Sequence, residues 1–209
     1  EEDKERRPDG APYAAFGKLW RDYGIILAKN EWILDKIDEK FIKNLDVADN
    51  TGEYNSLSHA ISGFNVLWDE DGDQDTAFFD AVDIAKKIFE NEVKSVCSEY
   101  RARKEILCAK IDEGVLILER YIPWKSVVIN EISNAKLIIY PSVRGGYNVQ
   151  TIPIAEESSE GRVMFPKEWL GKENKELGIT FCHPGNYLLS TKTLEQAKAV
   201  SKLVISGKH

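Results

Sequence analysis

Apolar side chains recur every three or four positions through the first half of the chain, as they do on the buried stripe of an amphipathic helix. The first such stretch begins beside Pro12 and stops at Gly24, so it predicts a helix that a proline opens and a glycine ends. A second stripe predicts a helix over residues 32–45. The mixed pattern over residues 53–67 predicts a loop with a short helix.

The longest helical pattern runs from Phe78 to Tyr100 and continues less regularly toward Cys108, and we expect Asp75 to cap this helix. Before it, Asp occupies alternate positions over residues 69–75, which imitates the start of an EF-hand loop. Gln74, however, stands where that loop requires glycine. We therefore expect a solvated loop here rather than a calcium site.

The pattern changes near Gly114, after which short apolar or alternating runs replace the helical stripes. A hairpin is expected around the glycine pair at 145–146, a short helix after Pro123, and a final helix that Thr193 caps. Five runs have the length and composition of β-strands, namely Val115–Leu118, Leu137–Tyr140, Tyr147–Ile152, Ile179–Cys182 and Tyr187–Ser190.

These two patterns predict an α/β or α+β protein in two lobes, a mostly helical one over residues 1–110 and a mixed one over residues 111–209. The 209 residues can form one or two domains with a real core. The net charge of -7 argues against a general nucleic-acid coat protein, although it leaves room for a local basic groove. The charged run Glu1–Arg7 is expected to be solvated.

No apolar run approaches the length of a membrane span, so no membrane association is expected. The three cysteines lack Cys-x-x-Cys spacing, which predicts buried, reduced thiols in a cytoplasmic protein. None of the three histidines has a partner at metal-ligand spacing, so a zinc site is disfavoured.

Asp46 and Asp49 are candidate metal ligands because carboxylates three residues apart lie on roughly the same side of a helical turn. Carboxylate oxygens are the ligands that Mn²⁺ and Mg²⁺ prefer. The alternative is that these residues only end a helix, because the Asn50-Thr51-Gly52 sequence that follows is also typical of a turn.

Arg144, Gly145 and Gly146 are candidate substrate-binding residues, because glycines expose backbone N–H groups and an arginine beside them can grip a phosphate. An ordinary hairpin turn is the alternative. His183 lies between two predicted strands and could project from a sheet edge into a cleft, although a lone histidine is more often structural.

Several blocks of this sequence, in this order, are similar to those of the Myg family. The blocks are Pro12–Trp20, Asp46–Asn50, Pro123–Lys125, Arg144–Gly146 with Val149–Pro153, Pro166–Gly171 and Phe181–His183. The resemblance covers nearly the whole chain from about Pro8 onward.

The resemblance implies a relative of the DHH phosphoesterases, with a parallel-sheet lobe that carries metal ligands and a smaller substrate-binding lobe. It implies Asp49, and less firmly Asp46, as ligands of Mn²⁺ or Mg²⁺, with Arg144, the glycine pair and His183 handling substrate. The implied activity is 3′–5′ exonuclease action on RNA or another phosphoester.

The His-containing metal motifs of that superfamily would lie before residue 1, so the expectation is a chain that is inactive alone and has little or no metal of its own. A homo-oligomer is also compatible with the resemblance. Two other functions stay open: a non-catalytic binding or assembly module, and a metal-dependent protein hydrolase as members of the family have been called.

Overall fold

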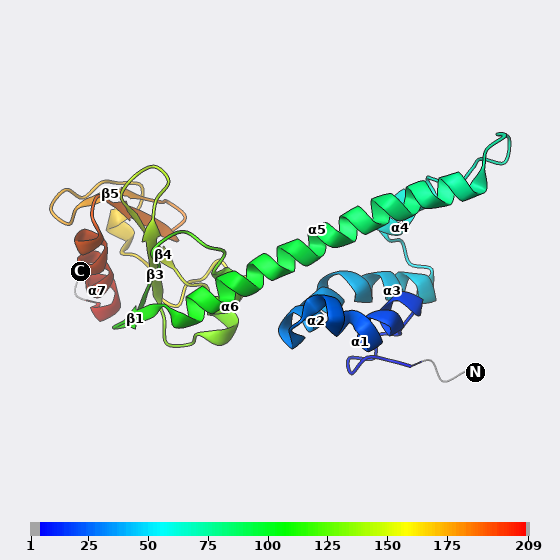
Figure 1. The fold of residues 1–209 in the computed structure, drawn as a ribbon. Helices are drawn as coiled ribbons and strands as arrows, with labels where there is room; N and C mark the ends of the chain where they lie inside the picture. The colour runs from blue at the N-terminus through cyan, green and yellow to red at the C-terminus, as the bar shows by residue number, and fades with distance from the viewer. Residues whose placement is uncertain (1–4, 208–209) are drawn as a thin grey trace. The chain divides into compact units, whose positions relative to one another are not determined.

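The structure, a computed structural model, describes residues 5–207 and is a mixed α/β fold (Figure 1). The chain divides into two compact units, Glu1–Tyr100 and Arg101–His209. The division falls inside the long helix α5 (Gln74–Cys108), whose end lies close to the lobe boundary predicted at residue 110. Among the described residues, no helix is both long and apolar enough to cross a bilayer.

The first unit is helical, as its hydrophobic stripes predict. Its core is formed by Trp20, Ile33, Ile37, Ile42 and Val96, with Phe89 of α5 packed against them. Its elements are α1 (Ala15–Ala28), α2 (Glu31–Ile37), the π-helix η1 (Asp38–Ile42), α3 (Lys43–Thr51), α4 (Ser56–Ser62) and most of α5.

Glycine does not end the first helix, so that prediction is wrong. Gly24 is buried inside α1, where an added Cβ would lie 2.6 Å from the Trp20 ring and 2.7 Å from Leu34. Glycine is therefore required there for close packing against α2. The helix instead ends at Lys29, which adopts the left-handed conformation.

The second predicted helix also extends beyond its expected end at Leu45. The α2, η1 and α3 segments are continuous and end only at Gly52, whose φ of 72° gives a left-handed C-cap. Asp46 and Asp49 therefore both lie within α3, and Asp49 is in its last turn. The sequence Asn50-Thr51-Gly52 does form the stop, as its turn-forming residues indicate, and the helix ends at Thr51, beyond Leu45.

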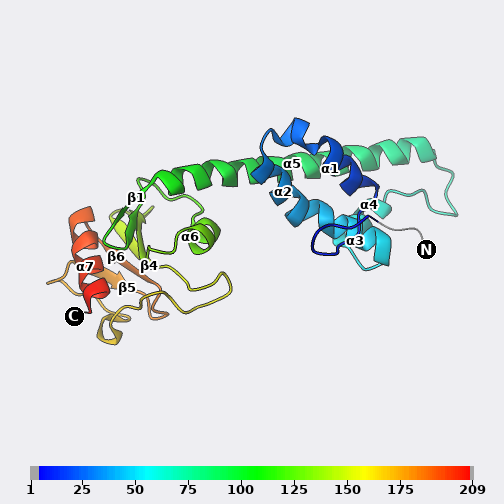
Figure 2. The ribbon, with the colours of Figure 1, turned by 90° about the horizontal axis from the view of Figure 1, so that it is seen from below.

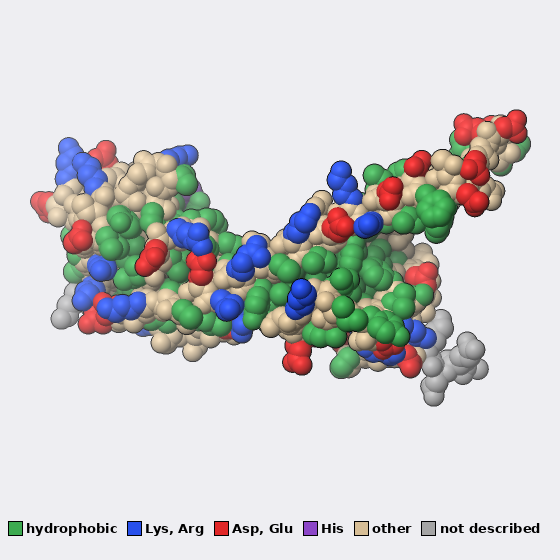
Figure 3. Space-filling view, viewed as in Figure 1, with side chains coloured by type: hydrophobic (Ala, Val, Ile, Leu, Met, Phe, Trp, Pro, Cys, Tyr) green, Lys and Arg blue, Asp and Glu red, His purple; other side chains and the backbone are tan. Residues whose placement is uncertain are grey.

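Asp73, not Asp75, caps α5. Its carboxylate accepts hydrogen bonds from the backbone N–H groups of Asp75 and Thr76, and from the Thr76 hydroxyl. These bonds hold the pKa of Asp73 below its usual value, with the hydroxyl making the largest contribution. The other acidic side chains of this loop are exposed, and Figure 3 shows them gathered at the start of α5.

The second unit is built on one six-stranded sheet of order β1-β2-β3-β4-β6-β5. Only the β2–β3 pair is parallel. The five predicted strands are confirmed to within one residue at each end. The sequence pattern did not predict β1, because a strand of three residues is too short to show an alternation. The strands are β1 (Lys110–Asp112), β2 (Val115–Ile117), β3 (Leu137–Pro141), β4 (Tyr147–Thr151), β5 (Ile179–Cys182) and β6 (Leu188–Thr191).

The helices of this unit cover the two faces of the sheet unequally (Figure 2). One face packs against α7 (Leu194–Ser206), which Thr193 caps as predicted, reciprocally with Gln196. On the other face, the end of α5 and the short helix α6 (Lys125–Glu131) pack over β2 and β3. No residue of β4, β5 or β6 belongs to that second core cluster among the described residues.

Candidate functional site

Asp46 is buried and ion-paired. Its side chain is 1 % exposed, and its Oδ2 lies 2.7 Å from Nη2 of Arg7. Its Oδ1 accepts a hydrogen bond from the backbone N–H of Gly17 at 3.1 Å. Arg7 also binds both carboxylate oxygens of Asp38, at 2.6 and 2.7 Å. One guanidinium thus joins two carboxylates that come from η1 and α3.

The packing around the Arg7–Asp46 ion pair leaves no space for a side chain on Gly17. An added Cβ on Gly17 would lie 1.7 Å from Oδ2 of Asp46, so α1 can approach α3 only with glycine at this position. Burial alone would lower the pKa of Arg7, but its hydrogen bonds to Asp38 and Asp46 outweigh burial and raise it. The expectation of a solvated segment is wrong for Arg7, which is 5 % exposed; residues 1–4 lie outside the described part of the chain.

Asp49, by contrast, is exposed to solvent. Asp46 and Asp49 are one helical turn apart, yet Asp46 faces the core and Asp49 faces water. Among residues 5–207, no group of three or more His, Cys, Asp or Glu side chains gathers where it could hold a metal ion. The described residues therefore do not form a divalent-metal centre by themselves, and a metal role for Asp46 and Asp49 stays a prediction.

The glycine pair forms the predicted hairpin between β3 and β4. The N–H of Gly145 donates to the carbonyl of Ser142, and the N–H of Ser142 donates to the carbonyl of Gly146. The Gly145 N–H is therefore occupied within the turn as the structure stands. Arg144 is exposed at the tip of this hairpin. Its guanidinium could contact an anion. The backbone of the turn, however, has fewer free N–H donors than the glycine pair predicts.

The two glycines should respond differently to replacement. Gly146→Ala should destabilise the second unit by about 2–4 kcal/mol, because φ is +72° and the new Cβ would lie 2.2 Å from the carbonyl oxygen of Thr191. Gly145→Ala meets only the conformational strain, since its φ is +90° and no atom lies within 4 Å. Urea unfolding of both variants measures the difference, and equal losses would contradict it.

His183 follows β5 and is held by its neighbours. Its Nδ1 accepts a hydrogen bond from the backbone N–H of Gly185 at 2.9 Å. In the neutral ring the proton is therefore assigned to Nε2, which is left as a donor. The ring centroid lies 4.4 Å from that of Tyr187 and 6.0 Å from that of Phe181.

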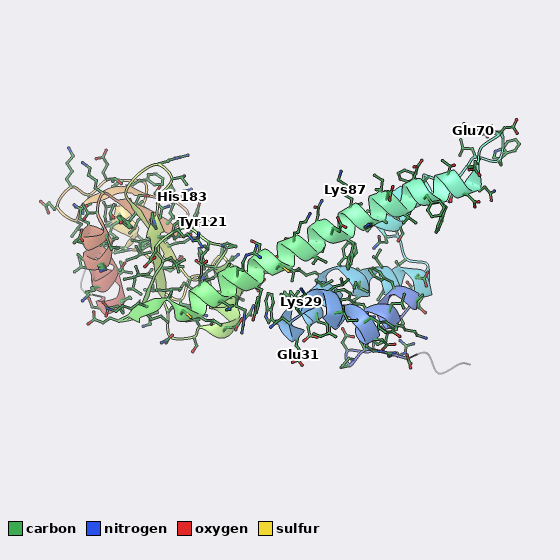
Figure 4. All side chains as sticks on the ribbon, viewed as in Figure 1. Lys29, Glu31, Glu70, Lys87, Tyr121 and His183 are labelled. Carbon is green, nitrogen blue, oxygen red and sulfur yellow. The ribbon has the colours of Figure 1, made fainter. Side chains whose placement is uncertain are left out.

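The sequence analysis missed two aromatic groups here: one contacts this histidine, and the other lies across the sheet at β3. The rings of Tyr121 and Tyr140 meet edge to face with their centroids 5.2 Å apart, while the rings of Phe181 and Tyr187 contact His183. We call Tyr121, Tyr140, Phe181, His183 and Tyr187 the ring cluster; Figure 4 labels two members, Tyr121 and His183. Strand alternation around Tyr140 and Phe181 was the only sequence signal that could have placed them on one face.

Register places the hairpin tip and His183 at different levels of the sheet. Tyr147, which follows the glycine pair, is opposite Pro141 at the end of the β3–β4 ladder. His183 pairs with Leu188 at the level of Gln150, three residues further along β4. At about 3.4 Å per residue the two levels are roughly 10 Å apart. A ligand touching both Arg144 and His183 would therefore have to be extended.

Together these features define a mixed α/β protein with a partly open sheet face as its candidate binding surface. The chain belongs to the MYG1 family: residues 10–205 match the family model MYG1_exonuc, described as "Uncharacterised protein family (UPF0160)". This match confirms the family resemblance found in the sequence.

Two curated relatives are similar to this chain along most of its length. The MYG1 protein of Saccharomyces cerevisiae is 22% identical over 215 residues, which cover 83% of this chain and 64% of the yeast protein. The MYG1 protein of Dictyostelium discoideum is 22% identical over 231 residues, covering 87% of this chain and 69% of that protein. The match thus spans slightly less than two thirds of the yeast relative. No solved structure matches this chain.

Proposed function

We propose that this chain belongs to a metal-dependent phosphoesterase that shortens RNA from its 3′ end, and that its second unit binds the substrate. The observation that carries the proposal is membership, over residues 10–205, in a family whose model bears the term exonuclease in its label. In this proposal the first unit is part of the metal-binding lobe of a DHH-type enzyme. Asp49 is its exposed candidate ligand for Mn²⁺ or Mg²⁺.

The side chains of the second unit support a role in holding an anionic strand. His183 offers an Nε2–H donor whose ring is fixed by the Gly185 N–H, and Arg144 offers an exposed guanidinium. Both the imidazole N–H and the charged guanidinium can donate hydrogen bonds to phosphate oxygens, and the charged donor binds them more strongly. Asp46 is a weaker candidate for a metal than Asp49, because both of its oxygens are already engaged by Arg7 and Gly17.

The isolated chain should bind Mn²⁺ only weakly. Asp49 is a single exposed carboxylate, and one such group displaces too few water molecules from a divalent ion. Titration calorimetry of residues 1–209 with MnCl₂ measures this affinity. Micromolar binding that Asp49→Ala abolishes would contradict the prediction.

The activity itself is tested in the full-length protein with Mn²⁺ and end-labelled single-stranded RNA. Stepwise shortening from the 3′ end, lost in Asp49→Ala and reduced in His183→Ala, would support the proposal. Trp68→Ala is the matched control, since Trp68 is 96% exposed and lies outside both candidate regions. Absence of turnover on RNA, DNA and small phosphoesters would reject it.

A non-catalytic binding module is the second candidate function. The exposed rings of Tyr121 and Tyr187 favour it, because large apolar side chains are exposed at many binding surfaces. In that case the full-length protein would bind a partner without hydrolysing any phosphoester.

A further inference from the structure

Among the described residues of the second unit, no helix packs over the part of the sheet formed by β4, β5 and β6 on the α6 side. By register, Tyr140, Asn148, Ser190 and Phe181 form one row across β3, β4, β6 and β5. The side chains of β4, β5 and β6 in this row are at least partly exposed. We call the side chains of Asn148, Gln150, Ser190, Phe181 and His183 the open sheet face; Leu188 also lies among them.

Exposed rings flank this face on two sides. Tyr121 is 60% exposed, and its ring packs edge to face against the ring of the buried Tyr140. Tyr187 and Phe181 are 41% and 42% exposed, and both rings contact His183. Rings that are held by neighbours while one side meets water can stack on a flat ligand at little entropic cost.

Between the rings the face is polar. The Tyr140 hydroxyl donates to Oε1 of Gln150, and the Ser190 hydroxyl donates to Oδ1 of Asn148, each at 2.8 Å. Burial, followed by the nearby Tyr121, raises the pKa of Tyr140, so its hydroxyl stays protonated at neutral pH. Each amide NH₂ group has two N–H donors, and Asn148 also hydrogen-bonds to Tyr140 through its side chain.

This polar centre argues against an apolar helix as the natural occupant. Such a partner would bury amide groups without giving them hydrogen bonds, which is unfavourable. The edge of a nucleobase carries both donors and acceptors, while its faces stack on aromatic rings. A flat ligand with polar edges therefore satisfies both features of the open sheet face.

Charge points to a polyanion. The second unit, Arg101–His209, contains 16 Lys and Arg against 12 Asp and Glu, a net charge of +4. The first unit, Glu1–Tyr100, contains 12 against 23, a net charge of −11. The overall charge of −7 thus conceals a basic second unit, and local potential governs nucleic-acid binding.

We propose that the open sheet face binds the unpaired bases of single-stranded RNA, which stack on Tyr121 and Tyr187 while the amides of Asn148 and Gln150 contact base edges. The choice of RNA rests on the proposed function; stacking and charge rest on the structure. Three strand spacings of about 4.8 Å separate β3 from β5, so the face extends over roughly 14 Å and accepts more than one base.

Fluorescence anisotropy with the 209-residue chain and a labelled eight-nucleotide single-stranded RNA tests this proposal. Tyr187→Ala and Tyr121→Ala should each weaken binding about tenfold, whereas Tyr187→Phe, which keeps the ring, should bind almost as the original chain does. Trp68→Ala should leave the affinity unchanged. Circular dichroism of each variant establishes that the fold is retained.

Two further probes separate stacking from charge. A ribose–phosphate oligomer of the same length without bases should bind at least tenfold more weakly than the RNA, and equal binding would overturn the proposal. Unchanged affinity in the Tyr121→Ala/Tyr187→Ala double variant would overturn it as well. Equal or tighter binding of matching single-stranded DNA would overturn the assignment to RNA.

Failure of this inference is distinguishable from failure of the proposed function. RNA binding that depends on the two tyrosines, in a full-length protein that hydrolyses no phosphoester, would retain the inference and reject the enzyme. Mn²⁺-dependent RNA shortening with an unchanged KM in the double variant would retain the enzyme and reject the inference.

Discussion

Replacing Arg7 with alanine should destabilise the first unit by about 3–5 kcal/mol, the largest loss of stability expected from a single change in this chain. The substitution leaves the carboxylate of Asp46, which is 1 % exposed, without its charged partner, and it removes both bonds to Asp38. An uncompensated buried charge costs far more than the ion pair itself contributes. Hydrogen exchange, followed peptide by peptide in urea, measures this loss in α1 and α3.

The matched control is Arg21→Ala. Arg21 also forms two ion pairs, with Glu5 and Asp22, but its side chain is 40% exposed, and solvent screens such pairs. We expect little change in the exchange of the same peptides. A comparable loss in both variants would mean that burial around Asp46 is not what makes Arg7 important.

The second large effect is expected for Arg162, which binds the C-terminal end of α6. Its guanidinium donates to four backbone carbonyls, those of Val128, Ile129, Ile132 and Ala135. Val128 and Ile129 lie in the last turn of α6, where carbonyls carry partial negative charge, and Ile132 and Ala135 follow the helix. Arg162→Ala should therefore destabilise the second unit by about 2–4 kcal/mol, measured by urea unfolding.

Arg162→Lys is an informative companion variant. An ammonium group is a point charge and cannot reproduce the planar fork that reaches four acceptors, so lysine should recover only part of the lost stability. The exposed Arg144→Ala serves as the control that should leave the unfolding midpoint nearly unchanged. Full recovery by lysine would mean that charge alone, and not hydrogen-bond geometry, holds this helix end.

Most elements were predictable because their signals are local. Helical stripes and short alternating runs located every long helix and all strands except β1. The helix end at Gly24 was wrong because that glycine packs against Trp20 and Leu34. The end at Leu45 was wrong because the next buried position of the helix is the polar Asp46, which an apolar stripe does not reveal. Tertiary contacts decided these boundaries.

The candidate site was harder to predict because its determinants are distant in sequence. Arg7 binds carboxylates 31 and 39 residues away, so nothing near it in the sequence marks it as buried. The spacing of Asp46 and Asp49 correctly indicated one helical turn. It did not indicate that the side chain of Asp46 would be buried while that of Asp49 stays exposed. The ring cluster required knowing that α6 covers only part of the sheet.

The π-helix η1 has a geometric consequence for the Arg7 cluster. In an uninterrupted α-helix, Asp38 and Asp46 would differ by about 80° in direction, since each residue advances roughly 100°. The wider turn, in which the N–H of Lys43 bonds to the carbonyl of Asp38, takes up one extra residue and brings both carboxylates to nearly the same azimuth. Deleting one residue between them would restore regular winding and leave the two aspartates seven positions apart, about 20° different in direction, so both carboxylates should still reach the guanidinium.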